Sequence, residues 1–464
     1  MSRARALNSL LTATFSIVLG WSYPGEGPLT TAAAAMESDD VFPGTPTWVF
    51  FVDKGVEDVA TALDERREAL SERALSRRER ARPGAAVDVD DLDVNEGYIL
   101  AVLDTGVTHR ATSRWLNAIS VEADATQLDA IEALEFVAST RPVAASRRSP
   151  SGTIAPPPDI DDYGVAQEQL DYIGVSTMHE CGFRGQGIII GVQDTGFDRD
   201  HESLQHIQVI DEWDFVNDDP DTADEAGDME GHEHHGTGVL SLLVGEDDDD
   251  FIGVVPDAGV ILSKTEDLTQ EDPVEEDYYV EGLEWIEGLG ADIFSSALGY
   301  TDWYSSQDLD GETAPTSIAA TLAVGRGLIM VVAAGNVGPD PRTLAPPADA
   351  DGVITVGSVN MKGEISEFSS RGPTADGRTK PDLVGPGDPV WMAESTNAGA
   401  YLPDYGTSFA TPLVAGVAAL VLESNPGMTP LQMWSRLTST ATQWDSPDDD
   451  YGWGIVAAMD AAGD

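Results

Sequence analysis

Residues 406–422 read GTSFATPLVAGVAALVL, a short turn followed by an almost uninterrupted apolar run. The run predicts a buried helix, because apolar residues stand at nearly every position rather than on one face. Ser408 would open this helix, beside its unpaired N–H groups and the positive end of its dipole. Such a serine is placed for nucleophilic attack, but a serine before an apolar helix is more often only an N-cap. Other stretches of the chain decide between these roles.

The charge of the chain is strongly negative. Its 464 residues carry 25 lysines and arginines against 82 aspartates and glutamates, a net charge of −57. This composition argues against nucleic acid as a partner, because phosphate backbones are bound by clustered Lys and Arg. With 41% hydrophobic residues, the chain is long enough for one large domain of roughly 300 residues and a smaller companion.

Lysine is nearly absent, with only Lys54, Lys264, Lys362 and Lys380. The acidic residues are spread through segments that have the pattern of a folded domain. We interpret this as a surface adapted to high salt, where repulsion between like charges is screened over short distances. Alternatively, the acidic clusters bind Ca²⁺, and the two interpretations are compatible.

The N-terminus has the features of a secretory signal peptide over 1–35. Arg3 and Arg5 precede an apolar stretch over 7–21 that is short for a membrane span, and the alanines at 32–35 offer a cleavage site. The alternative is an uncleaved N-terminal anchor. We found no other stretch suited to crossing a bilayer. We therefore expect a secreted monomer, extracellular or periplasmic, with no membrane contact after processing.

Cys181 is the only cysteine of the chain. A single cysteine excludes an intrachain disulfide and a thiolate metal site. Nothing in its surroundings suggests a base that would make it a nucleophile, so we expect a small buried hydrophobic residue.

Residues 43–145 predict a small α+β domain. Strands are expected at 47–52, at 115–122 by alternation and near 136–137; helices are expected at 56–80 and 125–133, and 98–103 is a further apolar run. Residues 146–162 follow as a linker, with Arg147 and Arg148 and three consecutive prolines. This composition is typical of solvated chain and of a cleavage site.

Residues 163–464 show a different pattern, in which short, fully apolar strands alternate with helices. The strands are expected at 188–192, 260–262, 293–294, 328–332 and 353–356, and the helices near 235–244, 277–289, 316–325, 409–423 and 428–439. Strands that are apolar on both faces indicate a parallel sheet covered by helices on both sides. The predicted fold class is therefore α/β, with a twisted parallel sheet preceded by the small α+β domain. Chemistry gathers at the carboxyl ends of the strands of such sheets.

Three polar residues stand where this fold would place chemistry. Asp194 and Asn336 follow expected strands, and His235 opens an expected helix. Asp194, His235 and Ser408 occur in the order aspartate, histidine, serine, which is one of the known chain orders of a catalytic triad. The alternatives are a capping role for Asn336 and a buried structural role for His235.

A histidine-rich loop precedes the expected helix. His232 and His234 lie close to His235 in the sequence, and such a loop is a candidate for metal binding. No zinc-type motif completes the set of ligands, so we expect no metal there.

Four segments resemble the signature segments of subtilisin-like serine peptidases, the subtilases. They are, in order, Asp194–Gly196, His235–Thr237, Ala333–Gly338 and Gly406–Pro412. Two further stretches, Gly253–Ala258 and Tyr451–Val456, are also similar to that family, so the resemblance covers 160–464. Several motifs in the right order are a strong signal, whereas any one of them alone would be weak.

The resemblance implies a role for each residue of the triad. Ser408 would attack the scissile carbonyl, His235 would take its proton and return it, and Asp194 would hold the imidazole. Asn336 and the Ser408 N–H would donate to the oxyanion. No organic cofactor would be required. Ca²⁺ stays open without a placed site, because Ser203 stands where many relatives have a calcium-binding aspartate.

The resemblance also implies a substrate-binding edge. A peptide would add there as a strand, along Ser296, Ala297, Leu298 and Gly299 on one side and Ala333, Ala334 and Gly335 on the other. Small residues on the second side would leave room for a large apolar or aromatic side chain before the cleaved bond. Glu275–Asp277 would fall at a more distant subsite or form a solvated acidic turn, and we expect the turn.

Residues 43–145 resemble the inhibitory propeptide of the family. The expected partners are therefore protein or peptide substrates and the chain's own propeptide, and the expected function is that of a secreted serine endopeptidase processed from a proenzyme. Asp104-Thr105-Gly106 repeats the tripeptide found at Asp194, which also marks pepsin-like aspartic peptidases, but that fold is all-β and would leave His235 unexplained. A catalytically silent relative that binds peptides is the other alternative, although it would have no reason to keep all four site residues.

Overall fold

The computed structural model describes residues 44–143, 163–225, 228–229, 231–247, 250–267, 275–301 and 304–463. The expected signal peptide at 1–35 and the expected linker at 146–162 lie outside these residues. The described residues form an antiparallel sheet, a larger parallel sheet and two short two-stranded sheets.

The antiparallel sheet consists of β1 (Thr45–Phe51), β2 (Thr108–Ser113), β3 (Ala118–Ala123) and β4 (Val137–Pro142), in the order β2-β3-β1-β4. One face of it packs on α3 (Glu96–Leu103) and α4 (Ala125–Glu132), which share a core with the strands. The small α+β domain that the sequence predicted is present, and because of the resemblance described above we call residues 44–143 the propeptide domain.

Local details of the propeptide domain differ from the prediction. The helix expected over 56–80 is two helices, α1 (Val59–Ala69) and α2 (Glu72–Ala81), because the Ser71 side chain caps the second. The apolar run 98–103 is helical, since the Asn95 side chain accepts from the Tyr98 N–H and starts α3. Strand β3 begins at Ala118 rather than at 115, because residues 114–117 form the turn after β2.

The parallel sheet has seven strands in the order β13-β12-β11-β10-β5-β9-β6. They are β5 (Ile189–Asp194), β6 (Gln208–Asp214), β9 (Gly259–Lys264), β10 (Ile293–Ser296), β11 (Ile329–Ala333), β12 (Ile354–Asn360) and β13 (Leu383–Asp388). The five strands predicted from apolar runs are present. The sequence missed the two edge strands, because β6 is largely polar and β13 is broken by Pro386 between two glycines.

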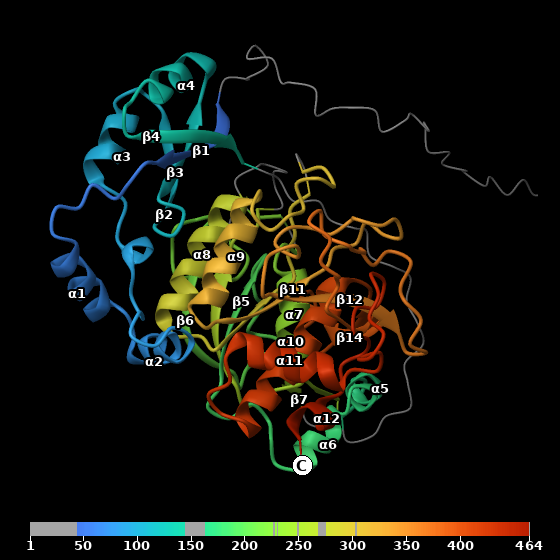
Figure 1. Cartoon of the computed structure of the whole chain (residues 1–464). Helices are drawn as coiled ribbons and strands as arrows, with labels where there is room; N and C mark the ends of the chain where they lie inside the picture. The colour runs from blue at the N-terminus through green and yellow to red at the C-terminus, as the bar shows by residue number, and fades with distance from the viewer. Residues whose placement is uncertain are drawn as a thin grey trace, which may run out of the picture. The chain divides into compact units, whose positions relative to one another are not determined.

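Helices cover both faces of the parallel sheet (Figure 1). On one face lie α7 (His234–Val244), α10 (Thr407–Ser424) and α11 (Pro430–Thr440), with the short helices α5 (Gln167–Tyr172), α6 (Val175–Glu180) and α12 (Ala458–Ala462). On the other face lie α8 (Glu275–Leu289) and α9 (Pro315–Gly325). Alternate strand residues such as Ile293 and Phe294 enter opposite cores. The predicted α/β fold class is confirmed.

The order in which strands are added to the sheet reverses between β5 and β10, which are parallel neighbours in the middle of the sheet. After β5 the chain builds β6 and β9 on one side, and after β10 it builds β11, β12 and β13 on the other. Ligands bind at such a reversal, outside the carboxyl ends of the strands. Asp194 and Ser296 are the last residues of β5 and β10, so the topology brings both to this edge.

Helix α10 forms the centre of the larger core, and every residue from Thr407 to Leu422 is buried. A Cβ at Gly416 would lie 2.5 Å from carbons of Val254, so only glycine lets the helix approach so closely. Among the described helices, α10 alone is long and apolar enough to cross a membrane, but 89% of that stretch is buried within the fold. We therefore interpret it as a core helix.

The propeptide domain packs on α8 and α9 through the face of its sheet that is opposite to α3 and α4. Trp48 of β1, Trp115 and Ala118 share a core cluster with Leu283 of α8 and Ala319 of α9. The two short sheets, β7 (Glu246–Asp247) with β8 (Phe251–Ile252) and β14 (Val390–Ala393) with β15 (Tyr401–Asp404), belong to residues 163–463.

The acidic segment Glu275–Asp277 is not the solvated turn that we expected. It is the buried first turn of α8. Asp277 accepts hydrogen bonds from the Arg110 guanidinium, with Nε at 3.0 Å, and from the Ser120 hydroxyl, both in the propeptide domain. The prediction failed because partners from a distant part of the chain cover this segment.

Cys181 is exposed, which contradicts its predicted burial. It forms the C-cap of α6 and precedes Gly182, whose φ of +91° turns the chain at the surface. The small helix ends there, so the cysteine does not enter the core.

Candidate active site

Asp194 and His235 meet at the carboxyl end of β5. The His235 Nδ1 lies 2.7 Å from Asp194 Oδ1, which also accepts the Thr195 N–H at 2.8 Å. Asp194 is fully buried and the His235 side chain is 20% exposed. The carboxylate therefore accepts from Nδ1–H, which leaves Nε2 of a neutral imidazole as the proton acceptor.

A glycine permits this close approach of α7 to β5. A Cβ at Gly236 would lie 2.2 Å from the Gly196 carbonyl oxygen and 3.0 Å from the Asp194 Cβ. The Gly-Thr-Gly that follows His235 thus brings the helix start against the strand end, where the histidine reaches the carboxylate. Asp104, in the second copy of the Asp-Thr-Gly tripeptide, is instead the C-cap of α3 in the propeptide domain.

Ser408 is the second residue of α10 and is 7% exposed. Its hydroxyl donates to the Ala297 carbonyl at 3.1 Å. The next residue, Phe409, lies against the imidazole of His235 with the ring centroids 5.3 Å apart. The start of α10 is therefore beside His235, and the serine hydroxyl points at the residue that follows β10.

Asn336 lies against the same helix start. Its Oδ1 accepts from the Thr407 N–H at 2.9 Å and from the Thr407 hydroxyl at 3.0 Å. The amide Nδ2 lies 3.7 Å from the place that a Cβ would take at Gly406. The capping alternative is thus realised by the oxygen of the amide, while its nitrogen lies near Gly406, two residues before Ser408.

The expected substrate-binding residues form two segments, one from Ser296 at the end of β10 to Gly299 and one from Ala333 at the end of β11 to Gly335. Ser296, Ala297 and Leu298 are buried, as are Ala333 and Ala334. The two segments come together at Ala345, which the sequence did not single out: its Cβ would be 2.7 Å from a Cβ at Gly299 and 2.9 Å from one at Gly335. Gly335 has a φ of +107°, which also favours glycine there.

Two carboxyl groups near His235 were not predicted. Burial raises the pKa of Glu233, the N-cap of α7, to about 7, with Asp224 and Asp198 adding to the rise. Burial also raises the pKa of Asp404, at the end of β15, against the opposing effect of His235. Proximity to His235 in the sequence could have indicated Glu233, whereas no sequence signal indicated Asp404.

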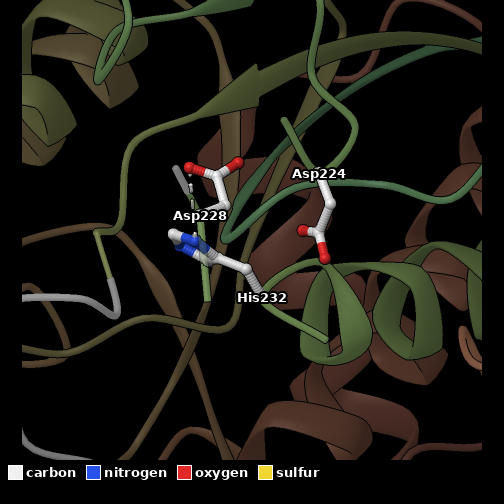
Figure 2. Close-up of side chains that lie close together, drawn as sticks. All are labelled: Asp224, Asp228 and His232. Carbon is white, nitrogen blue, oxygen red and sulfur yellow. Dashed lines mark ion pairs between the residues drawn. The ribbon is translucent and has the colours of Figure 1, made fainter. Parts of the chain in front are cut away.

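The histidine-rich loop contains one group that could hold a metal ion. Asp224, Asp228 and His232 each offer a ligand atom within 4.8 Å of the others (Figure 2). His234 is not part of this group and lies 3.4 Å from the Ser395 hydroxyl through Nδ1. Ser203, the residue at the doubtful calcium position, bonds with its hydroxyl to His201 Nδ1 at 2.9 Å.

A network of buried charges joins the propeptide domain to α8. Glu287 of α8 pairs with both Arg77 and Arg78, and Asp91 pairs with Arg78 at 3.0 Å and with Arg326 at 2.9 Å. All five side chains are at most 3% exposed. Burial opposes ionisation of Asp91, but the arginines outweigh it and lower its pKa to about 2.

A second acceptor on α8 binds the turn after β2. Glu284 accepts from the Ser113 hydroxyl at 2.5 Å and from the backbone N–H groups of Arg114 and Trp115 at 3.3 and 3.1 Å. Burial raises the pKa of Glu284 in spite of these donors. Helix α8 is therefore the main polar docking element for the propeptide domain.

The parallel sheet, the Asp–His pair at its reversal point and the serine at the start of a buried helix define the class of α/β serine peptidases. Residues 185–454 match the model of the subtilase family, and residues 46–154 match the model of the peptidase S8 propeptide domain of Bacteroidota. The chain belongs to the subtilase family and carries its propeptide domain.

Known proteins agree with this assignment. The serine protease AprX of Bacillus subtilis (strain 168) is 31% identical over 306 residues, which are 59% of this chain and 66% of AprX. Subtilisin E of the same organism is 30% identical over 304 residues, 65% of this chain and 71% of subtilisin E.

A solved structure extends the likeness to the propeptide domain. Fervidolysin from Fervidobacterium pennivorans, described as a keratinolytic enzyme related to subtilisin, superposes with a TM-score of 0.63 at 22% identity. The match covers 92% of this chain and 62% of fervidolysin. At this identity the likeness concerns the fold alone.

Proposed function

We propose that this chain is a secreted serine endopeptidase that forms an acyl-enzyme at Ser408 and is processed from a proenzyme. The observation that carries the proposal is the buried Asp194–His235 pair beside the start of α10, with Nδ1 and Oδ1 2.7 Å apart. The propeptide domain seated on α8 supports the zymogen part of the proposal.

The catalytic steps follow from the chemistry of these groups. Ser408 Oγ turns from the Ala297 carbonyl toward His235, loses its proton to Nε2 and attacks the carbonyl carbon of the substrate. Asp194 stabilises the imidazolium. The Asn336 amide and the Ser408 N–H donate to the oxyanion, and His235 then protonates the leaving amine. Water then attacks the acyl-enzyme while His235 takes its proton. The bond between the acyl group and Ser408 breaks, and His235 returns the proton to Ser408.

The substrate edge and the surroundings of the enzyme are further parts of the proposal. Ser296–Gly299 and Ala333–Gly335 would line the bound peptide, with a large apolar or aromatic side chain preferred before the cleaved bond. The enzyme would act as a monomer outside the cytoplasm, without an organic cofactor. The propeptide domain would inhibit it until processing.

The test is the intact mass of the chain made in high salt, as wild type and as Ser408→Ala. The wild type should lose its first 150 residues or so, because the acyl-enzyme mechanism cleaves the chain itself, and Ser408→Ala should keep them. Ser424→Ala, at the other end of α10, is the matched control and should be processed normally.

A catalytically silent, peptide-binding relative is the second candidate, favoured by the hydrogen bond of the Ser408 hydroxyl to Ala297 instead of His235. An active-site-directed fluorophosphonate decides between the two. Covalent labelling of Ser408 in the processed wild type supports the peptidase, and the absence of labelling supports the silent relative.

A further inference from the structure

The acidic loop before α7 is tied to the sheet by a buried ammonium group. Lys264, the last residue of β9, is fully buried, and its Nζ lies 2.9 Å from Asp214 Oδ2 and 2.8 Å from Asp228 Oδ2. Two carboxylates therefore share one cation, with Lys264 and Asp214 fully buried and Asp228 10% exposed. Burial opposes the charged form of Lys264, but the hydrogen bonds that its ammonium donates to Asp228 and Asp214 outweigh burial and raise the pKa of Lys264, so the ammonium stays charged.

The possible metal ligands around Asp228 are engaged with other groups. Asp228 Oδ2 accepts from Lys264, and Asp224 accepts the N–H groups of Gly231 at 3.2 Å and Glu233 at 2.8 Å. His232 Nε2 donates to the Glu266 carbonyl at 2.7 Å. Figure 2 shows the side chains of Asp228, Asp224 and His232 gathered on this loop. The lysine ammonium already supplies positive charge to the carboxylate that a cation would bind.

Lys264 occupies a particular place relative to the catalytic pair. It is the register partner of Asp194 on β5 and of Asp214 on β6, so it stands between the two strands. The Thr265 N–H also donates to the Asp194 carbonyl at 3.0 Å. The strand end that carries the ammonium is thus fixed to the residue that holds His235.

The loop held by Lys264 leads directly into the helix that carries His235. Asp228 is bound to Lys264 at one point of β9, and His232 is bound to Glu266 two residues further along the same segment. His235 lies only three residues after His232. These two anchors place the start of α7 against the end of β5, where Nδ1 reaches Asp194.

We propose that Lys264 is a positioning residue for the peptidase reaction: its ammonium acts as a built-in cation that holds the loop of Asp228 and so sets the contact between His235 and Asp194. The kinetic part of this inference rests on the proposed function, whereas the structural part does not. Loss of the Lys264–Asp228 contact should loosen the start of α7, so that the Nδ1–H bond to Asp194 is populated for less of the time.

The primary test compares Asp228→Ala with Asp221→Ala in the full-length chain. Asp228→Ala removes the Lys264 anchor of the loop, keeps the His232 anchor and leaves the Lys264–Asp214 pair intact, so no buried charge loses its last partner. Asp221→Ala removes the same charge from an exposed site on the same loop, where its carboxylate only caps the Ala223 N–H. Asp228→Asn is the conservative rescue, because its Oδ1 still accepts from Lys264.

Kinetics are normalised to the active sites that a fluorophosphonate labels, which corrects for misfolded protein. Asp228→Ala should lower kcat by about 10- to 100-fold per labelled site, the size expected from a small misplacement of a catalytic group. KM should change little, since the substrate edge is not touched. Asp228→Asn should recover most of the loss.

A second readout does not depend on activity. The Nδ1 proton of His235 in a strong hydrogen bond to Asp194 gives a far-downfield proton resonance, which can be recorded on Ser408→Ala to prevent self-cleavage. In that background the resonance should be lost in Asp228→Ala and kept in Asp221→Ala. If this pattern is found but the fluorophosphonate does not label Ser408 of the wild type, the positioning role of Lys264 is retained and the proposed peptidase activity is rejected.

Two results would overturn the inference. One is an unchanged kcat together with an unchanged downfield resonance in Asp228→Ala, because Lys264 would then hold a loop without effect on His235. The other is a rise of the thermal midpoint of the wild type on addition of CaCl₂ that is abolished in Asp228→Asn. The loop would then bind a metal ion, and the Lys264 ammonium would not be the cation that holds it.

Discussion

The interface between the propeptide domain and α8 is buried and polar. The proposed catalytic edge, which is the edge of the parallel sheet with Asp194, His235, Asn336 and Ser408, is also buried and polar, but it is built differently. At the interface, Glu287 and Glu284 of α8 find their partners in the propeptide domain, at Arg77, Arg78 and the turn after β2. At the catalytic edge, the partners of Asp194 and Asn336 lie within residues 163–463.

This difference separates what is lost on processing from what is kept. Removal of the propeptide domain leaves Glu287 and Arg326 without their buried counter-charges, whereas the bonds of His235 to Asp194 and of Asn336 to Thr407 lie within residues 163–463. A charged interface of this kind gives specific but reversible docking, since its groups are rehydrated on separation. The site is therefore expected to keep its geometry when its inhibitor leaves.

The strongest way to break the interface is Glu287→Ala. The substitution leaves Arg77 buried without its carboxylate, and loss of one partner of a buried pair costs about 3–5 kcal/mol. Inhibition of the processed enzyme by the propeptide domain added in trans should weaken by about 10²- to 10³-fold. The kcat of the processed enzyme should stay unchanged.

Glu281→Ala is the matched control for this experiment. Glu281 lies on the same helix and is partly exposed, and the structure gives it no ion pair among the described residues. Its removal should alter inhibition far less than that of Glu287. Equal inhibition of the wild type and Glu287→Ala would show that apolar packing around Trp48 and Trp115, and not the charges, carries the docking.

At the catalytic edge the informative substitution is Asn336→Asp. Aspartate keeps an oxygen for the Thr407 N–H and hydroxyl, so the cap of α10 persists, but the donor to the oxyanion is lost. We expect kcat to fall by about 10²- to 10³-fold, the size known for the oxyanion-hole asparagine of subtilisin, with a smaller change in KM.

Thr407→Val is the control for Asn336→Asp. It removes one of the two bonds to Asn336 Oδ1 and leaves the amide N–H₂ in place. Its kcat should stay within about threefold of the wild type, since no donor to the oxyanion is removed. A similar loss in both variants would indicate that Asn336 acts as a cap and not as an oxyanion donor.

The sequence predicted the parts of the molecule whose structure is determined by residues close together in the chain. Short apolar strands, the Gly-Thr-Gly after His235 and the apolar run after Ser408 each specify a strand or a helix start without help from distant residues. The fold class and the neighbourhood of Asp194 and His235 followed from them. The edge strands β6 and β13 were missed because β6 is largely polar and because Gly385, Pro386 and Gly387 interrupt the apolar pattern of β13.

The parts that the sequence did not predict depend on contacts between distant residues. The buried acidic turn at Glu275–Asp277 has the composition of a solvated loop, and only Arg110 and Ser120 of the propeptide domain make it interior. Lys264 stood out only as one of few lysines, and its pairing with Asp214 and Asp228 requires the folded loop. Ala345 likewise becomes part of the substrate edge only through tertiary packing.

The smallest expected effect concerns the exposed charges, which differ from both buried regions. Three of the four lysines, Lys54, Lys264 and Lys380, are buried, so Lys362 is the one lysine on the described surface. Repulsion among the exposed carboxylates should destabilise the fold in dilute buffer, and molar NaCl should relieve it. We expect a thermal midpoint higher by several degrees and several-fold higher activity at molar NaCl than in dilute buffer.

The Glu287 pairs are shielded from salt by burial, so inhibition by the propeptide domain should weaken little over the same range. Activity that is highest in dilute buffer and falls as NaCl rises would refute the salt adaptation, and inhibition that collapses in molar salt would show that the interface is held by exposed charges instead of the buried network.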